Sequence, residues 1–247
     1  YLFFNSFYYY FIYGIRNFFN KGEICYGIKK LKYEKYDNIF VSHFINSSQF
    51  TSNDDFYFKE MPNISCRNVK TLVILINQSE LDLSKSFDKF TGKNYEIIIL
   101  SNKLNTKNNF LLTISSLNAC IILLKDIIFN LKGLHKIFMM NALSHLFTDH
   151  CQFTLRLYYQ IKEITKIYKP KNIFFTFEGY AWEKALCMAS RDISKFTKCI
   201  GFQHSRLFKY QHSLKREFKN EMDPDIVLTS GDYSFAELKS KFKKIKT

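Results

Sequence analysis

The sequence lacks the paired cysteines that mark a structural metal site. Its six cysteines are scattered, and no two of them form a CxxC pair. This spacing predicts neither a zinc motif nor a small disulfide framework, and it is typical of a protein kept in a reducing cytoplasm. His145 and His150 are five residues apart, so they do not share a helix face as a metal pair would. We therefore expect no metal and no other cofactor.

Short motifs for nucleotide and nucleic-acid binding are also missing. The sequence has no GxGxxG fingerprint, no P-loop, no paired Cys/His finger, no aromatic RNP strand and no GxxG loop. Its formal net charge is nevertheless +14. Such a charge favours anionic partners, which include nucleic acid, a membrane surface and phosphorylated metabolites. The missing motifs make nucleic acid the least favoured of these.

No segment has the pattern of an export signal or of a clear membrane span. Residues 1–20 are apolar and aromatic, but they lack a basic start followed by a cleavage site. A span needs about 20 mostly apolar residues. Polar residues interrupt both residues 1–20 and a second apolar stretch, residues 110–129. We expect a core or surface-docked helix over the first stretch and a buried helix over the second, with contact to a membrane surface as the alternative.

What the sequence does contain is a series of short apolar runs. The composition, 47% hydrophobic and 23% charged, is that of a globular chain with a sizeable core. The runs predict strands over residues 39–44, 71–76, 95–100, 173–177, 199–202 and 226–228. Helical spacing occurs between or after them, at residues 79–90, 141–168, 182–191 and 233–246. This alternation predicts an α/β fold, with a Rossmann-like, mainly parallel sheet flanked by helices, and one such domain over residues 1–247.

The stretch over residues 172–205 concentrates the candidate site. A strand ends before Glu178, a helix follows, and the next strand ends at Gln203, His204 and Ser205. Two strands joined by a helix usually run parallel, so both polar turns emerge at the same carboxyl edge of the sheet. Ligands of open α/β sheets bind along that edge. We therefore predict that Glu178 and His204 lie in one site.

Each candidate residue also has a structural alternative. Glu178 would serve as a base or would cap the following helix, and His204 would move a proton or bond a neighbouring carbonyl. Glu183 lies inside the helix, where pairing with Arg191 or with the backbone is favoured over catalysis. His43, after the first strand, would contact a ligand or be structural. Gln203 would orient the ligand.

Two further residues complete this set of alternatives. Arg206 would attract an anionic ligand or lie in a solvated loop. Trp182 is expected in the core, with sugar stacking as the lesser alternative.

The segments FEGYAWEKAL, Arg191, GFQHS and DPDIVLTSG together resemble bacterial surface-carbohydrate biosynthesis proteins of the GT-B glycosyltransferase type. The resemblance covers residues 168–238, and Ser205 stands where many such transferases have the Gly of a Gln-His-Gly loop. It implies one Rossmann-like half of a two-domain enzyme, with the nucleotide-sugar donor bound by a second domain beyond residue 247. It also implies a glycan or lipid-linked acceptor and a cytoplasmic place, peripheral to the inner membrane.

On this resemblance the site divides into two groups. Glu178 and His204 would be catalytic. Gln203, Ser205, Glu183, Arg206 and His43 would bind substrate. Residues 1–247 alone are not expected to turn over a sugar nucleotide. Two rival functions remain open: a non-catalytic Rossmann-like domain that binds an anionic glycan or partner, and a basic nucleic-acid-binding protein.

Overall fold

A computed structural model of the chain describes residues 24–28, 31–205, 207, 213–214, 221–239 and 245–246. The helix predicted over residues 1–20 and the side chain of Arg206 lie outside the described residues. The chain divides into two compact units, one of Tyr1–Ile24 with Asn102–Tyr159 and one of Cys25–Ser101 with Gln160–Thr247. That the whole chain forms a single domain stays a prediction.

The second unit is built on a sheet of eight strands within the described residues. In chain order the strands are β1 (Cys25–Tyr26), β2 (Asn38–Phe44), β3 (Thr71–Asn77), β4 (Glu96–Leu100), β5 (Asn172–Thr176), β6 (Lys198–Gln203), β7 (Ile226–Thr229) and β8 (Ile245–Lys246). All described pairs are parallel except β1 with β4. All six predicted strands are present, and the predicted mainly parallel α/β sheet is confirmed.

The strand order places a switch point at the centre of this sheet. The order is β1-β4-β3-β2-β5-β6-β7-β8, so β3 and β4 follow on one side of β2, and β6 and β7 follow β5 on the other. The chain reverses direction across the sheet between β2 and β5, which pair from Asn38↔Asn172 to Val41↔Phe175. Open α/β sheets bind ligands at the carboxyl ends of the strands that flank such a point.

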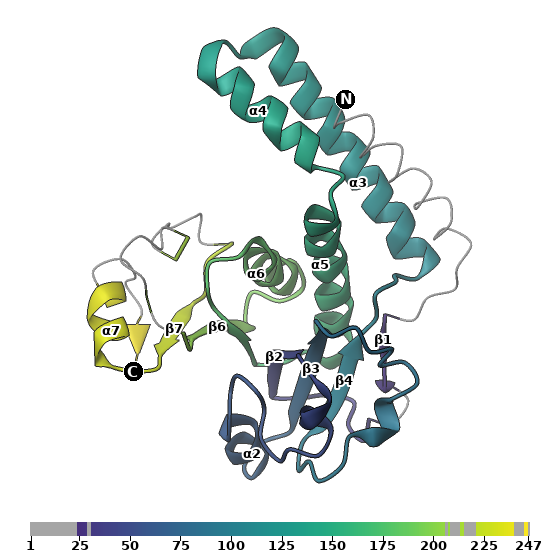
Figure 1. Cartoon of the computed structure of the whole chain (residues 1–247), viewed down its shortest axis with the longest axis vertical. Helices are drawn as coiled ribbons and strands as arrows, with labels where there is room; N and C mark the ends of the chain where they lie inside the picture. Colours follow the sequence, from purple (N-terminus) through teal and green to yellow (C-terminus); the bar gives the residue numbers. More distant parts are fainter. Residues whose placement is uncertain are drawn as a thin grey trace. The chain divides into compact units, whose positions relative to one another are not determined.

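The central strands are apolar because both of their faces are covered, as a parallel sheet requires. Phe40 of β2 stacks on Phe174 of β5, with ring centroids 4.5 Å apart, and meets Phe58 edge-on at 5.2 Å. Helix α6 (Ala181–Ile193) lies beside β6 and buries Trp182 and Leu186 (Figure 1). The described residues of this unit also form α2 (Met61–Cys66), α7 (Asp232–Lys239), the 3-10 turns η2 (Ser47–Phe50) and η3 (Phe87–Lys89), and the second half of α5 (Asp149–Tyr168).

The helix predicted over residues 79–90 is wrong, because within it the structure forms only η3. Side chains bond the backbone locally there and compete with a helix. Asn77 Oδ1 accepts from the backbone N–H of Ser79 at 3.0 Å, and its Nδ2 donates to the Leu81 carbonyl at 2.9 Å. Asp82 Oδ1 accepts from the N–H of Ser84 at 3.1 Å. Leu83 is buried as expected, whereas Leu81 is exposed.

The continuous helix predicted over residues 141–168 is interrupted. The structure has α4 (Gly133–His145) and α5 (Asp149–Tyr168), with a turn between them. Thr148 holds this turn, since its N–H and its hydroxyl both donate to the His145 carbonyl, at 3.1 and 2.7 Å. The helix predicted over residues 233–246 is also too long, because Ile245–Lys246 belongs to strand β8.

The apolar stretch at residues 110–129 lies in the first unit and forms most of α3 (Thr106–Lys125) and a π-helical turn, η4 (Asp126–Asn130). The predicted helix is therefore present. The prediction that it is buried is wrong, because Phe110, Ile121 and Phe129 are 52%, 64% and 76% exposed. Of the described helices, Thr106–Asn130 is the one long and apolar enough to cross a membrane, judged by length and composition alone.

Candidate functional site

The turn between β5 and α6 carries Glu178 and depends on a glycine. Gly179 adopts a φ of +85°, and a Cβ added to it would lie 2.5 Å from the carbonyl carbon of Ser213. Only glycine fits such a backbone at so close an approach. The Ser213 hydroxyl donates to the Glu178 carbonyl at 3.0 Å. The turn is thus fixed against a segment that lies 35 residues further along the chain.

Glu183 holds the same turn from inside α6. Its buried carboxylate accepts the backbone N–H groups of Glu178, Gly179 and Tyr180, at 2.8, 2.7 and 2.9 Å. This is the reach of a third helical residue back to the helix start. Burial raises the pKa of Glu183 to about 8, and the three N–H groups oppose that rise. The expected pairing of Glu183 with the backbone is confirmed.

The alternative prediction, that Glu183 pairs with Arg191, is wrong. Arg191 pairs instead with Asp225, at 3.0 Å. Glu183 is closed to solvent. The structure therefore gives its carboxylate a positioning role in the turn, and direct contact with a substrate stays a prediction.

Glu178 and His204 lie together at the carboxyl edge, as the sequence predicted. His204 Nδ1 is 3.5 Å from Glu178 Oε1, and the two side chains are 22% and 15% exposed. Their strands are neighbours, and the N–H of Phe177 donates to the Phe202 carbonyl at 2.9 Å just before the two residues. The juxtaposition is confirmed. The catalytic roles of the two residues stay predictions.

The surroundings of His204 lower its pKa and so favour the neutral imidazole at neutral pH. Burial lowers its pKa and nearby Lys59 lowers it further, while the Glu178 carboxylate and the Phe202 carbonyl oppose the shift. The Tyr57 ring meets the imidazole edge-on, with centroids 4.6 Å apart. A neutral imidazole with a carboxylate beside one nitrogen can take a proton at its other nitrogen.

His43 ends β2 on the other side of the switch point and is almost fully buried. Its Nε2 lies 3.4 Å from the Thr176 hydroxyl, and its ring meets Trp182 edge-on at 5.3 Å and Tyr57 at 5.5 Å. Burial, helped by His204, lowers the pKa of His43 to about 4. Nδ1 is buried and has no hydrogen-bond partner within the described residues. Trp182 is in the core, as expected.

The other two predicted substrate-binding residues follow β6. Gln203 is fully buried, and its Nε2 donates to the Ser205 carbonyl. Its Oε1 meets no hydrogen-bond partner in the part of the chain that the structure describes. Gln203 therefore braces the strand end, and Ser205 stands beyond it at the surface of a cavity.

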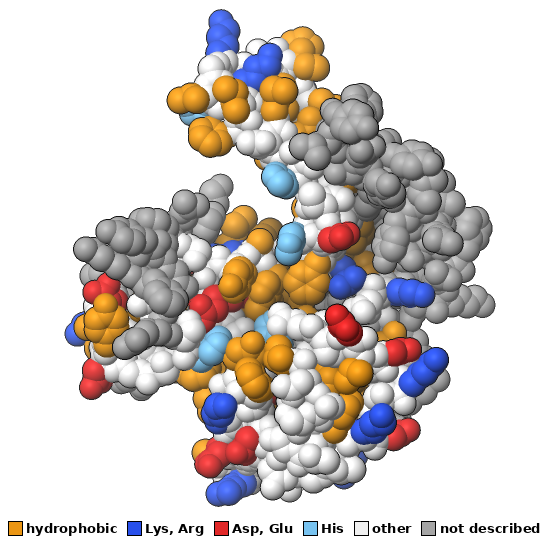
Figure 2. All heavy atoms as spheres, in the orientation of Figure 1, with side chains coloured by type: hydrophobic (Ala, Val, Ile, Leu, Met, Phe, Trp, Pro, Cys, Tyr) orange, Lys and Arg blue, Asp and Glu red, His pale blue; other side chains and the backbone are white. Residues whose placement is uncertain are grey.

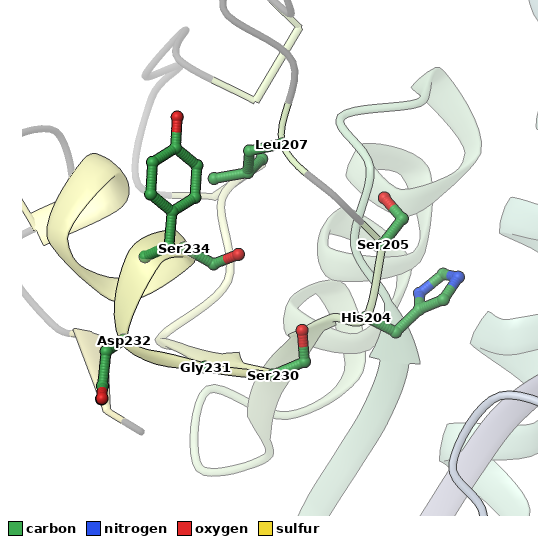
Figure 3. Close-up of a pocket in the computed structure, with 8 residues that line it drawn as sticks. His204, Ser205, Leu207, Ser230, Gly231, Asp232 and Ser234 are labelled. Carbon is green, nitrogen blue, oxygen red and sulfur yellow. The ribbon is translucent and has the colours of Figure 1, made fainter.

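This cavity has a volume of about 600 Å³ and lies between the ends of β6 and β7 and the start of α7. It is lined by His204, Ser205, Leu207, Ser230, Gly231, Asp232, Tyr233 and Ser234. Figure 3 shows the His204 ring pointing away from Ser230 and Ser234. The imidazole thus faces Glu178 and Tyr57, and a ligand in the cavity would meet the backbone side of His204.

The sequence did not identify the loop residues that complete the site. Tyr57 and Lys59 come from the loop after β2, which Asp55 fixes by accepting from the Ser42 hydroxyl at 2.8 Å and from the Tyr57 N–H at 2.9 Å. Tyr180, 60% exposed, adds an aromatic side chain at the Glu178 turn. The available signal was the polar loop after the first strand, because such loops often line a cleft.

No group of three or more His, Cys, Asp or Glu side chains that could hold a metal occurs within the described ranges. The chain matches no protein-family model, no curated protein and no solved structure.

Proposed function

We propose that this chain is the acceptor-side half of a GT-B-type glycosyltransferase of bacterial surface-polysaccharide synthesis. The α/β sheet supports the proposal at the level of fold, because each half of such an enzyme is Rossmann-like. The observation that carries it is the pair formed by His204 Nδ1 and Glu178 Oε1, 3.5 Å apart at the carboxyl edge of the sheet. The pair lies beside the switch point, where ligands of such sheets bind.

In the proposed reaction this chain accepts one proton from the acceptor. A neutral His204 takes the proton of an acceptor hydroxyl at Nε2, while Glu178 stabilises the imidazolium through Nδ1–H. The hydroxyl oxygen then forms a bond to the anomeric carbon of the donor sugar. The bond from that carbon to the nucleotide phosphate breaks, and the phosphate leaves with its electron pair. The donor would be a nucleotide sugar held by a second domain, and the acceptor a glycan or a lipid-linked glycan.

The same proposal implies a cellular location for the protein. Nucleotide sugars are cytoplasmic, and a lipid-linked acceptor lies at the inner membrane. We therefore place the protein in the cytoplasm, peripheral to that membrane.

A second candidate function is a non-catalytic domain that binds an anionic glycan. The observation in its favour is that the cavity beside α7 is lined by the serines Ser205, Ser230 and Ser234, while the His204 ring points away from Ser230 and Ser234 (Figure 3). A ligand held only in that cavity would not meet the imidazole.

A transfer assay separates the two functions. The protein containing this chain would be given a panel of nucleotide sugars and lipid-linked glycans, and nucleotide release would be measured. We expect Glu178→Gln and His204→Ala each to lower turnover on the order of 100-fold or more, because each removes part of the proton-transfer pair. The melting temperature should stay within a few degrees of the wild type.

Matched controls come from exposed residues of the same types. Glu80→Gln and His135→Ala should leave turnover unchanged, since both side chains are exposed and remain outside the pair. Wild-type turnover in both Glu178→Gln and His204→Ala would contradict the proposed chemistry. Glycan binding without nucleotide release from any donor would favour the binding domain instead.

A further inference from the structure

The first unit contains a helical hairpin whose outer surface is unusually apolar. Helix α3 and turn η4 run out to Asn130, and α4 returns beside α3 (Figure 1). The two arms pack through an inner cluster of Cys120, Ile127, Leu143 and Phe147. The cluster buries one face of each arm, and the opposite face of each arm is not covered by it.

That other face is apolar where a water-exposed helix would be polar. Near the end of the hairpin, seven large apolar side chains are between 57% and 76% exposed: Ile121, Ile122, Ile128, Phe129, Leu134, Ile137 and Phe138. We call these seven residues the hairpin tip. A surface helix of a water-soluble protein keeps its apolar residues on the buried stripe and its charged residues opposite. Figure 2 shows hydrophobic side chains gathered over this end of the hairpin, among a few basic ones.

The charged residues interspersed among the residues of the hairpin tip are mostly positive. No charged residue occurs from Asn108 to Leu124. Lys125, Lys132 and Lys136 then follow within twelve residues, against one acid, Asp126, whose carboxylate accepts from Asn130 Nδ2 at 2.8 Å. Lysines that flank exposed apolar side chains can keep their ammonium groups in the headgroup layer while their stems lie along the apolar surface.

The lengths of the two arms favour insertion of the tip over a full span. Helix α4 has 13 residues. At 1.5 Å per residue this is about 20 Å, which is shorter than the roughly 30 Å hydrocarbon core of a bilayer. The returning arm therefore cannot cross the membrane, although Thr106–Asn130 is long enough to do so.

We infer that the hairpin tip docks on the surface of an anionic lipid bilayer. Its apolar side chains enter the boundary between headgroups and acyl chains, and Lys125, Lys132 and Lys136 contact lipid phosphates. The basic charge selects this occupant, because negative headgroups complement the three lysines, whereas a second hairpin tip would bring the same lysines toward one another. This inference goes beyond the proposed chemistry and does not depend on the Glu178–His204 pair.

Vesicle flotation tests the inference on the full chain. Vesicles of phosphatidylglycerol with phosphatidylethanolamine would be compared with vesicles of phosphatidylcholine. We expect the wild type to float with the anionic vesicles. The triple variant Ile128→Ser, Phe129→Ser, Phe138→Ser should lower the bound fraction at least tenfold. The triple variant Lys125→Gln, Lys132→Gln, Lys136→Gln should bind weakly and lose its preference for anionic lipid.

Controls separate docking from loss of fold. Phe196, 93% exposed in the other unit, gives a matched apolar variant, Phe196→Ser, which should bind like the wild type. Circular dichroism should report unchanged helix content in every variant, because the replaced side chains are exposed. Light scattering without lipid should report the same mass for wild type and tip variant.

Three results would overturn the inference: no flotation of the wild type with either vesicle, equal flotation of the tip variant, or a lipid-independent oligomer that the tip variant dissociates. The last result would make the hairpin tip a protein interface. None of them bears on the transfer assay, so this inference and the proposed function fail separately.

Discussion

Two histidines on the carboxyl edge of the sheet differ in the groups that surround them. His204 has a carboxylate beside Nδ1 and is 22% exposed, so it can exchange a proton with a ligand. His43 is almost fully buried between Thr176, Trp182 and Tyr57, and its Nδ1 has no hydrogen-bond partner within the described residues. Residue type alone would assign both to the site. Their surroundings make His204 the reactive candidate and His43 a support for it.

The first prediction concerns the pH dependence of stability through His43. Its pKa is lowered from 6.5 to about 4 in the folded chain. Between these two values the unfolded chain binds the proton and the folded chain does not, so lowering the pH favours unfolding. The free energy of unfolding should therefore fall by up to about 1.4 kcal/mol per pH unit through this one group. Above pH 6.5 its contribution should be constant.

Urea unfolding of wild type and His43→Gln at several pH values between 4 and 7 measures this contribution. The variant cannot titrate at this position, so its stability should fall less steeply as the pH drops. His135→Gln serves as a control, because His135 is exposed, and it should keep the wild-type slope. Equal slopes in wild type and His43→Gln would show that His43 is not buried as a neutral ring.

At the scale of the element, the β5–α6 turn is the part that sets the site. Glu183 gathers three N–H groups, and Gly179 allows the turn to approach Ser213. Together they direct Glu178 toward His204. Neither residue needs to touch a ligand for the site to depend on it.

The second prediction uses two glycines as a matched pair. Gly179→Ala should destabilise the chain by about 1–3 kcal/mol, since alanine is strained at a φ of +85° and its Cβ would clash with the Ser213 backbone. Gly231→Ala should stay within about 0.5 kcal/mol, because no atom lies within 4 Å of the added Cβ. Chemical denaturation of both variants gives the comparison. Similar stability for the two would mean that the turn is not held as described.

At the scale of the whole molecule, the parallel sheet could be predicted from the sequence. Several helix boundaries and contacts between distant residues could not. Strands β3 and β5 are short apolar runs with polar ends, and such runs have few alternatives in an α/β chain. Because β5 and β6 are joined by one helix, a right-handed crossover is enough to predict that Glu178 lies near His204. The fold class and the centre of the candidate site could be predicted from local pattern for this reason.

The failures have local and long-range causes. At residues 79–90, Asn77 and Asp82 bond their own backbone and override the helical spacing of Leu81, Leu83 and Phe87. In α3, an apolar pattern predicts a helix but does not say whether its outer face meets protein, water or lipid. The approach of Tyr57 to His204 joins residues far apart in the sequence, and no local pattern encodes it.

The account depends most on the coupling between Glu178 and His204, and an NMR titration of the His204 imidazole measures that coupling directly. In wild type its pKa should lie below 6.5, because burial lowers it more than the Glu178 carboxylate raises it. In Glu178→Gln the pKa should fall further, since the charge that stabilises the imidazolium is gone, whereas Glu80→Gln should leave it unchanged. A His204 pKa that is the same in wild type and Glu178→Gln, or higher in the variant, would contradict the account.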